Sequence, residues 1–253
     1  MKFQTFSFKN IQEISEFAAS FIRARAEESI RSRGYFTLVL SGGKTPKPLY
    51  ELLSGPRYRE KINWENVYVF WGDERYVSKD QPTSNYKMAF ESILSKVPLP
   101  EANVFPIPGP DATESPDHAS RIYEQTIHRF FKLHGEIKNF PSYDIILLGM
   151  GEDGHTASLY PGNPALGETI RWVRSVNAPD YAPVKQRVTL TLPVLNSAKN
   201  VLFLISGVNK RDVLKKVIWE IKQGGPTFPA SMIRPAGNLL LLTDILEEDE
   251  KPQ

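Results

Sequence analysis

The sequence predicts an α/β fold with a doubly wound, mostly parallel sheet and helices on both faces. Short apolar runs alternate along the chain with stretches of helical periodicity, and this βαβα order is typical of parallel sheets. Several runs, including FTLVL, DIILL, VLFLI and NLLLL, are apolar almost throughout, which indicates strands covered on both faces. No repeat and no dividing linker is visible, so we expect a single domain over residues 1–253, with 246–253 as a frayed tail.

Apolar runs bounded by turn residues mark the candidate strands. They are Lys2–Phe8, Tyr35–Leu40, Val67–Trp71, Asn103–Ile107, Tyr143–Leu148, Trp172–Val176, Arg187–Leu192, Val201–Ser206 and Asn238–Thr243.

Helices are predicted between these strands from capping residues and apolar stripes. Asn10 is placed to cap a long helix, with Glu13 at the capping-box position. Ser115-Pro116 opens another helix in the expected order of a cap followed by proline. Ser84–Val97 and Asn209–Gln223 have the pattern of two more helices.

The composition narrows the class of protein. The chain has 41% hydrophobic and 24% charged residues, as soluble globular proteins do, and its net charge is +2. Such a small charge predicts neither a nucleic-acid nor a membrane partner. Cysteine is absent, which removes disulfides and thiolate metal ligands and suits a reducing compartment. Since no signal-peptide pattern or apolar run of membrane-spanning length is visible, we expect a cytoplasmic protein.

Four polar clusters each follow a predicted strand directly. In an open parallel sheet, ligand sites form beyond the carboxyl ends of the strands. We therefore expect the clusters to lie at one edge of the sheet and to line one pocket. They are SGGKTP (Ser41–Pro46), GDERYV (Gly72–Val77), GMGEDGH (Gly149–His155) and GVNKRD (Gly207–Asp212).

The first cluster has the pattern of an anion site. The double glycine of Ser41–Gly43 lets backbone N–H groups approach a ligand, and the helix that follows points its positive end at the same place. The loop is not a Walker A motif, because Leu38 stands where that motif requires its earlier glycine. We interpret the loop as a phosphate site. The alternative is an ordinary turn between a strand and a helix.

Lys210 lies in the fourth cluster, at the predicted start of a helix. A basic residue at this position opposes the helix dipole, and a bound anion would compensate for that cost. We interpret Lys210 as a ligand contact. The alternative is a solvated surface lysine.

The second cluster places three charges, Asp73-Glu74-Arg75, directly after an apolar strand. Arg75 is suited to an anionic or carbonyl oxygen, and Asp73 is suited to sugar hydroxyls. The alternative is a surface ion pair, which would contribute little stability.

The third cluster contains G-M-G-E-D-G at Gly149–Gly154, a literal match to the dinucleotide fingerprint. Three observations argue against a dinucleotide-binding loop. Pro161 interrupts the helix that should run on from the last glycine, and the acidic pair Glu152-Asp153 would face a pyrophosphate. In addition, Arg174 stands about where an acidic residue would bind the ribose.

His155 ends this loop and differs from the other histidines. His118, His128 and His134 lie on or just after one predicted helix, as surface or packing residues. His155 instead follows a buried strand within a glycine-rich turn, and Asp153 is near enough to set its tautomer or basicity. We interpret His155 as a catalytic base. The alternative is a structural histidine.

Long stretches of the chain resemble the glucosamine-6-phosphate isomerase/6-phosphogluconolactonase family. They are LSGGKTPKPLYELL, FWGDERYV with SNYKMA after it, LLGMGEDGHTASLYPG and RVTLTLPVLNSAKNVLFLISGVNK, in this order. The likeness extends from about Phe8 to Thr243 and points to the lactonase branch. It implies a modified Rossmann-like fold related to glucosamine-6-phosphate deaminase and ribose-5-phosphate isomerase. It also implies hydrolysis of 6-phospho-D-glucono-1,5-lactone to 6-phosphogluconate, the second step of the oxidative pentose phosphate pathway.

The resemblance also implies roles for single residues. His155 matches the general base proposed for the family. The Ser41–Gly43 loop and Lys210 match positions that bind the sugar phosphate. The remaining matches are charged residues of the pocket, namely Arg75, Arg187, Asp73 and Asp153. Which arginine faces the phosphate and which faces the lactone carbonyl stays open. We expect no metal or cofactor, a small phosphosugar lactone as partner, and a monomer or weak homo-oligomer. The catalytic candidates are His155, Asp153, Arg75 and Asp73, and the substrate-binding candidates are Ser41, Gly42, Gly43, Lys44, Arg187 and Lys210.

Two alternatives to the lactonase are considered. The deaminases of the family carry a glutamate five residues after the histidine as a partner for ring opening, and Tyr160 stands at that position here. Lactone hydrolysis is therefore preferred. Non-catalytic sugar-phosphate sensors share related folds, but such sensors usually carry a DNA-binding domain, for which the chain before Tyr35 leaves no room.

Overall fold

The computed structural model of the chain describes residues 1–135 and 139–245, so the tail predicted at 246–253 lies outside the described residues. The strands within them are β1 (Lys2–Ser7), β2 (Phe36–Leu40), β3 (Val67–Trp71), β4 (Asp73–Arg75), β5 (Val104–Phe105), β6 (Ile145–Leu148), β7 (Val173–Asn177), β8 (Gln186–Leu190), β9 (Asn200–Ile205) and β10 (Asn238–Thr243). The helices are α1 (Ile11–Arg33), α2 (Lys47–Ser54), α3 (Pro56–Arg59), α4 (Asn85–Ala89), α5 (Pro116–Leu133), α6 (Leu192–Asn196) and α7 (Arg211–Gln223).

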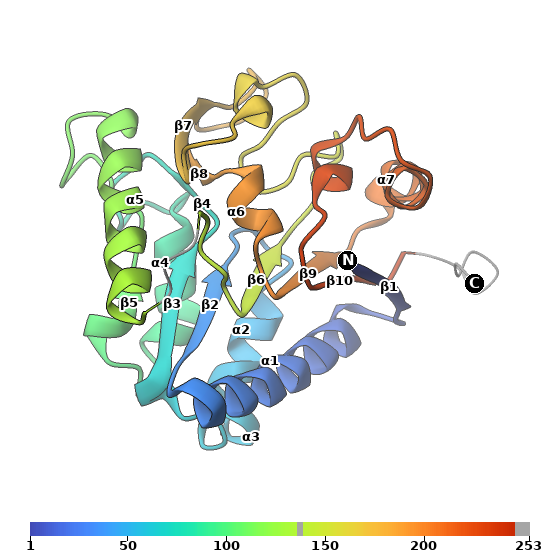
Figure 1. Ribbon diagram of the computed structural model, residues 1–253. Helices are drawn as coiled ribbons and strands as arrows, with labels where there is room; N and C mark the ends of the chain where they lie inside the picture. Colours follow the sequence, from blue (N-terminus) through green and yellow to red (C-terminus); the bar gives the residue numbers. More distant parts are fainter. Residues whose placement is uncertain (136–138, 246–253) are drawn as a thin grey trace.

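Seven of the described strands form one parallel sheet, as predicted. Its order is β1-β10-β9-β6-β2-β3-β5, and every neighbouring pair is parallel. Figure 1 shows this sheet in the middle of the molecule, with α5 and α7 on opposite sides of it in that view. The non-consecutive order requires crossover connections, which the helices supply. The doubly wound α/β class is thereby confirmed.

The apolar runs become the central strands because they are covered on both faces. β2 and β9 are buried along their whole length. The edge strand β1 alternates between exposed and half-buried residues over its first half. This difference follows the sequence pattern, since a strand buried on both faces needs apolar residues at every position.

The predicted helix caps are confirmed at both long helices. The Asn10 side chain accepts a hydrogen bond from the Glu13 N–H at 2.9 Å, at the start of α1. At the start of α5, the Ser115 hydroxyl accepts from the His118 N–H at 3.1 Å, and Pro116 occupies the first helical position. These caps satisfy backbone donors that a helix leaves without partners in its first turn.

The helix predicted over Ser84–Val97 is shorter and less regular than expected. It begins as predicted, with the Ser84 hydroxyl capping α4, but a π-helical turn replaces the α-helix at Phe90–Leu94. The Ser95 N–H donates to the Phe90 carbonyl five residues back at 3.1 Å, and the Ser95 hydroxyl donates to the same carbonyl at 2.8 Å. The polar side chain therefore competes for the helix carbonyl and ends the segment early.

The strands predicted at Trp172–Val176 and Arg187–Leu192 are present, but they lie outside the main parallel sheet. They form β7 and β8 of a separate antiparallel sheet with the order β4-β8-β7. The third strand, β4, is the Asp73–Arg75 triplet, for which the sequence predicts no strand. The chain leaves the main sheet at Trp71 and pairs at once with β8, and the Leu190 N–H donates to the Gly72 carbonyl at 2.8 Å.

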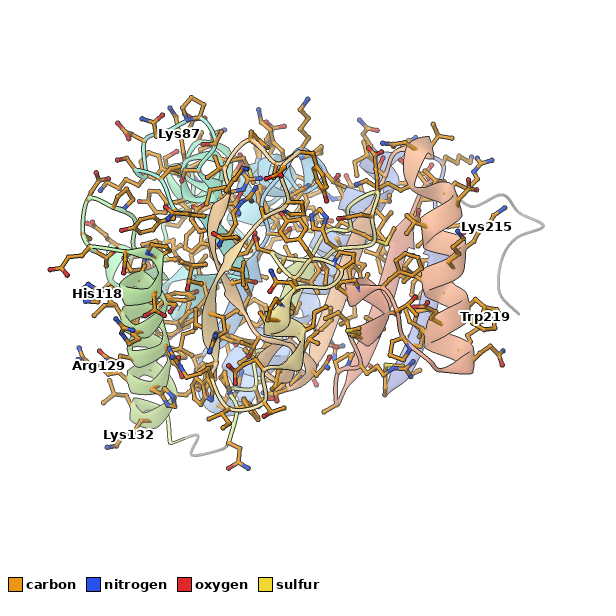
Figure 2. The ribbon with its side chains drawn as sticks, turned by 90° about the horizontal axis from the view of Figure 1, so that it is seen from above. Lys87, His118, Arg129, Lys132, Lys215 and Trp219 are labelled. Carbon is orange, nitrogen blue, oxygen red and sulfur yellow. The ribbon has the colours of Figure 1, made fainter. Side chains whose placement is uncertain are left out.

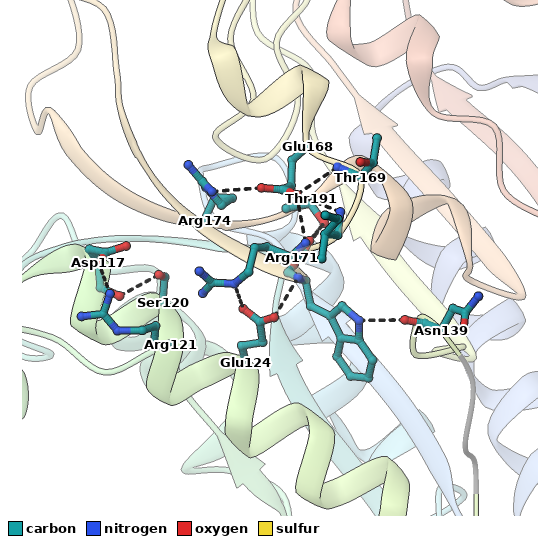
Figure 3. Close-up of polar contacts among 12 residues, drawn as sticks. Asp117, Ser120, Arg121, Glu124, Asn139, Glu168, Thr169, Arg171, Arg174 and Thr191 are labelled. Carbon is teal, nitrogen blue, oxygen red and sulfur yellow. Dashed lines mark hydrogen bonds and ion pairs between the residues drawn. The ribbon is translucent and has the colours of Figure 1, made fainter.

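Polar contacts join this small sheet to α5. Glu124 accepts a hydrogen bond from Arg171 Nε at 2.6 Å and another from the Trp172 backbone N–H at 3.2 Å (Figure 3). The Thr191 hydroxyl donates to the Arg171 carbonyl at 2.7 Å. Because Glu124 is on α5 and Trp172 precedes β7, these bonds hold the small sheet beside α5.

We propose that the chain is a single domain. Buried residues of both sheets, among them Val173, Val188 and Leu190 of the small sheet, belong to one continuous hydrophobic core. Separate domains would each be expected to have a core of their own. Among the described helices, none combines the length and the apolar character that a membrane crossing requires.

Candidate active site

The four polar clusters follow four adjacent strands of the main sheet, β9, β6, β2 and β3. Their loops line one cleft of about 440 Å³. The expectation of a shared edge and a shared pocket is therefore confirmed. Of the residues predicted for the site, the cleft is lined by Ser41, Gly42, Gly43, Lys44, Asp73, Arg75, His155, Arg187 and Lys210. Asp153 lies directly behind the cleft, in contact with His155.

The double-glycine loop is shaped by its neighbours. A side chain at Gly42 would meet the Asn85 amide oxygen at 1.8 Å, so only glycine fits between Asn85 and the cleft. Gly43 adopts a left-handed backbone conformation, with φ of +91°, which other residues rarely adopt. Both glycines are thus required by local geometry, and the backbone of the loop is held at the wall of the cleft.

The small sheet brings two arginines together. Arg75 on β4 lies directly opposite Arg187 on β8 in the strand register. Thr83 accepts a hydrogen bond through its carbonyl from Arg75, and the Val184 carbonyl accepts from Arg187 Nε at 2.8 Å. Each guanidinium is therefore anchored by a backbone carbonyl while it contributes to the cleft wall.

Asp73 is the acidic neighbour of these arginines, and it is buried. Its carboxylate accepts a hydrogen bond from the Ser158 hydroxyl at 2.5 Å. Burial lowers the pKa of Arg187, and the charge of Asp73 acts in the opposite direction. The cleft therefore contains fixed charges of both signs, which suits a ligand with a strong negative charge at one end and hydroxyl groups along its length.

His155 is oriented by Asp153. The ring Nδ1 lies 2.5 Å from Asp153 Oδ1, and the same oxygen accepts from the His155 backbone N–H at 3.1 Å. Because an ionised carboxylate only accepts hydrogen bonds, Nδ1 carries the proton of the neutral ring, and the lone pair of that tautomer is on Nε2. A side chain at Gly151 would come within 2.2 Å of the imidazole ring, so this glycine makes room for it.

The environment of His155 is completed by two tyrosines. Tyr160 is buried, and its ring centroid lies 4.5 Å from that of His155. The Tyr181 hydroxyl donates to the second carboxylate oxygen of Asp153. The His155 side chain is still 27% exposed. The imidazole is thus held from one side and open to the cleft.

Asp153 stays ionised in this arrangement. Burial by itself would raise the pKa of Asp153, but the hydrogen bonds from His155 and Tyr181 outweigh that effect and hold the pKa well below its ordinary value. Burial, together with the bond to Asp153, raises the pKa of Tyr181 to about 12. The carboxylate is therefore a permanent acceptor for the imidazole, which is what a partner of a general base requires.

Lys210 comes from the fourth cluster, in a 3₁₀ turn just before α7. Burial lowers its pKa, and the charges of Glu152 and Asp244 oppose that shift. Glu152 also accepts a hydrogen bond from Asn209, so the third and fourth clusters are in direct contact. Lys210 is therefore a partly buried cation on the same cleft as the double-glycine loop.

Three further residues also line the cleft: Asn85, Tyr160 and Tyr181. The sequence marks Tyr160 only by its place five residues after His155, and it does not identify Asn85 or Tyr181 as site residues. Asn85 is within the SNYKMA motif, but its buried amide, which donates to the Asp73 carbonyl at 2.9 Å, gives no signal in the sequence. Tyr181 lies in the turn between β7 and β8, where no periodic pattern distinguishes it.

The other histidines lie away from the cleft, as predicted. His118 projects from the outer side of α5, and the same view shows Trp219 on the outer side of α7 (Figure 2). His128 stacks on Trp172 with ring centroids 3.5 Å apart, and His134 Nδ1 lies 2.8 Å from the Phe130 carbonyl. Among the described histidines, His155 is the one that faces the cleft.

The loop that matches the dinucleotide fingerprint does not lead into a helix. The residues after Gly154 form turns, and the next helical segment is a 3₁₀ turn at Pro164–Gly167. The backbone N–H of Gly154 is used within the loop, donating to the Gly151 carbonyl at 3.1 Å. This arrangement lacks the helix N-terminus that a pyrophosphate needs.

Comparison with known proteins places the chain in a family. The family described as glucosamine-6-phosphate isomerases/6-phosphogluconolactonase matches residues 9–242. The chain belongs to this family. Among members of the glucosamine-6-phosphate isomerase/6-phosphogluconolactonase family, a 6-phosphogluconolactonase from Synechocystis sp. is 42% identical over 235 residues, covering 93% of this chain and 92% of that protein. Another from Nostoc sp. is 41% identical over 224 residues, covering 88% of each.

Solved structures of the family have the same fold. The 6-phosphogluconolactonase from Leishmania guyanensis superposes with a TM-score of 0.83 at 30% identity, covering 96% of this chain and 97% of that one. The 6-phosphogluconolactonase from Trypanosoma brucei gives 0.83 at 28% identity and covers 96% of both chains. A monomeric glucosamine-6-phosphate deaminase shares the fold at a TM-score of 0.76 and 23% identity, covering 96% of this chain and 97% of that one.

Proposed function

We propose that the protein is a 6-phosphogluconolactonase, which hydrolyses 6-phospho-D-glucono-1,5-lactone to 6-phosphogluconate in the oxidative pentose phosphate pathway. The observation that carries the proposal is the position of His155. Its imidazole, held by Asp153, lines the same cleft as the Ser41–Gly43 loop and Lys210. The relatives from Synechocystis sp. and Nostoc sp., both named 6-phosphogluconolactonase, support the substrate.

The phosphate is assigned to one end of the cleft. Hydrogen-bond donors and positive charge surround it there. They come from the Ser41 hydroxyl, the backbone N–H groups of Gly42 and Gly43, the neighbouring Lys44, the ammonium of Lys210 and one of the two cleft arginines. This contact is remote from the reacting carbon, so its binding energy serves to position the sugar ring.

The chemical step uses His155 as a general base. Nε2 takes a proton from a water molecule while the water oxygen forms a bond to the lactone carbon C1. A cleft arginine or backbone N–H groups stabilise the negative charge that develops on the carbonyl oxygen. The bond between C1 and the ring oxygen then breaks, and the imidazolium returns the proton to that oxygen. The new carboxylic acid ionises, so each turnover releases one proton to solvent.

Asp153 keeps the imidazole in the tautomer that this step needs, because it accepts the Nδ1 proton. Asp73 is positioned for sugar hydroxyls between the arginines and Ser158. No step in this sequence requires a metal or cofactor, because water is the nucleophile and a lactone is an activated ester.

The packing of Tyr160 favours lactone hydrolysis over deamination. Tyr160 packs against His155 with the two rings tilted by 38°, at the position where the deaminases have their glutamate. A phenol in that place supplies no carboxylate for ring-opening acid chemistry. A sugar-phosphate sensor, the remaining alternative, would have no use for an oriented imidazole at the cleft.

The proposed activity is tested by proton release. The lactone is generated in place by a dehydrogenase, and acid production is followed with a pH indicator against a blank for spontaneous opening. We expect the protein to accelerate proton release far above the blank. Release at the blank rate would overturn the proposed function.

Lys210→Ala is expected to weaken phosphate recognition. Loss of a charge-assisted contact to the phosphate should raise KM for the lactone by about 10–100-fold and change kcat by less than about 3-fold. Steady-state kinetics with phosphorylated and unphosphorylated lactone measure the effect. Lys216→Ala, on the exposed face of α7, removes the same charge and serves as the control. A Lys210→Ala variant that discriminates between the two lactones as well as the parent does would contradict the phosphate assignment.

We also propose a cytoplasmic protein that acts as a monomer or weak homo-oligomer and has no nucleic-acid partner. The composition supports this, with no cysteine and a net charge of +2. One relative from rice is named a probable 6-phosphogluconolactonase, chloroplastic, so its name gives a plastid location for that protein. Cell fractionation tests the location, and sedimentation tests the oligomeric state.

A further inference from the structure

Two fully buried tyrosines make the same unusual pair of contacts. The Tyr50 hydroxyl accepts from the Ser41 backbone N–H at 3.0 Å and donates to the Ser41 carbonyl at 2.8 Å. The Tyr123 hydroxyl accepts from the Trp71 backbone N–H at 2.9 Å and donates to the Trp71 carbonyl at 3.0 Å. Both tyrosines are 0% exposed. A single hydroxyl thus satisfies both backbone groups of one residue in each case.

Each of these contacts lies where a central strand of the sheet ends. Ser41 directly follows β2, and Trp71 is the last residue of β3. Next to β3, the edge strand β5 pairs only with Val69 and Phe70, so Trp71 has no strand partner on that side. Backbone groups buried without partners are costly. The tyrosine hydroxyls, from α2 and α5, take the place of a neighbouring strand.

The residues held in this way lie at the points where the two site segments begin. Ser41 begins the double-glycine loop, and it lines the cleft itself. Trp71 is followed by Gly72, also at the cleft, and then by β4, which carries Asp73 and Arg75. A shift of either strand end would therefore move a wall of the cleft.

We propose that Tyr50 and Tyr123 are positioning residues of the active site, which act by fixing the backbone of Ser41 and Trp71 where the phosphate loop and the Asp73–Arg75 strand begin. The inference rests on the proposed function for its kinetic consequences, but its structural part is independent of that function.

The hydroxyl is needed as donor and acceptor at once. Burial raises the pKa of both Tyr50 and Tyr123, so neither phenol ionises in the working range of pH. Phenylalanine keeps the ring and its packing but removes both hydrogen bonds. The exchange of tyrosine for phenylalanine therefore isolates the proposed role.

Tyr143 provides a matched control. It is also 0% exposed and packs against Phe70 and Phe131, but its buried hydroxyl has no hydrogen-bond partner among the described residues. Tyr143→Phe removes a buried hydroxyl from the same core without releasing a backbone group. We expect this variant to keep wild-type kinetics within about twofold, because no satisfied polar group loses its partner.

The kinetic experiment compares the three tyrosine variants with the wild type. Tyr50→Phe should raise KM for the lactone by about 10-fold with kcat within about 3-fold, because the phosphate loop loses its anchor. Tyr123→Phe should lower kcat/KM by about 10-fold, because the strand that carries Asp73 and Arg75 is displaced from the substrate. Kinetics of both variants that match Tyr143→Phe, even with lowered thermal stability, would reduce the hydroxyls to a purely structural role and overturn the inference.

Amide hydrogen exchange measured by NMR supplies a second test that does not depend on activity, and its first part needs only the wild type. In the wild type, the Ser41 and Trp71 amide protons should exchange as slowly as those in the middle of β2 and β3. Tyr50→Phe should speed exchange at Ser41 by at least about 10-fold and leave Trp71 unchanged, with the converse for Tyr123→Phe. Fast exchange at both amides in the wild type would overturn the inference. An inactive wild type with both amides protected would instead overturn the proposed function alone.

Discussion

His155→Ala is expected to lower kcat by about 10²–10⁴-fold and to change KM much less. That size is typical of the loss of a general base, and the phosphate contacts that dominate binding lie elsewhere in the cleft. Without the imidazole, the attacking water has no acceptor for its proton as it bonds to C1. The measurement is steady-state hydrolysis of the phosphorylated lactone, corrected for spontaneous opening.

The control for this variant is His118→Ala. His118 projects from the outer side of α5, and only its backbone N–H takes part in the helix cap (Figure 2). Removal of this imidazole should leave kcat within about twofold of the wild type. If His155→Ala keeps a kcat near that of the parent, His155 has no part in the mechanism.

Asp153→Asn is expected to lower kcat by about 10²-fold or more. An amide in place of the carboxylate presents N–H groups as well as an oxygen, so it no longer enforces a proton on Nδ1 and a lone pair on Nε2. The pKa of Asp153 is held well below its ordinary value by His155 and Tyr181, so the carboxylate is ionised throughout the usual assay range. The loss should therefore be present across the usual assay range, from about pH 5 upward, because protonation of Asp153 does not disable the wild type there.

Glu152→Gln is the matched control for this variant. It removes one negative charge from the adjacent position of the same loop and keeps an oxygen that accepts from Asn209. Its kcat should stay within about 3-fold of the wild type. Equal losses in Asp153→Asn and Glu152→Gln would mean that loop charge, rather than orientation of His155, limits the reaction.

The sequence predicts the main sheet and the edge at which the site forms, because both depend on patterns along one strand and the next. Continuous apolar runs identify β2 and β9, and the rule that sites lie at the carboxyl ends of parallel strands brings their loops together. The sequence also identifies His155 as a candidate site residue, because a histidine in a glycine-rich turn after a buried strand is not in the surface position that is usual for this residue.

The small sheet was harder to predict. Asp73–Arg75 is a polar triplet with no strand periodicity, and its partner β8 is more than 110 residues further along the chain. Only the antiparallel register reveals that Arg75 lies opposite Arg187. The segments of β7 and β8 read correctly as strands, but a strand pattern does not state which sheet the strand joins.

The roles of Tyr50, Tyr123 and Tyr181 could not be predicted from the sequence, for a different reason. Tyr50 and Tyr123 occupy buried positions of helices, where an aromatic residue is what a core stripe predicts. Their hydroxyls matter because two strand ends, distant in sequence, lie against those helices. Tyr181, in a turn, has no pattern at all, and its contact with Asp153 exists only once β7 and β8 are folded back over the cleft.

The central claim, that one cleft holds the phosphate and presents the lactone carbon to His155, is tested most directly by a crystal structure with 6-phosphogluconate bound. We predict that the phosphate lies between the Ser41–Gly43 loop and Lys210, with the C1 carboxylate within hydrogen-bonding distance of His155 Nε2. A phosphate beside His155, or a carboxylate beyond the reach of a single bridging water from Nε2, would contradict the account.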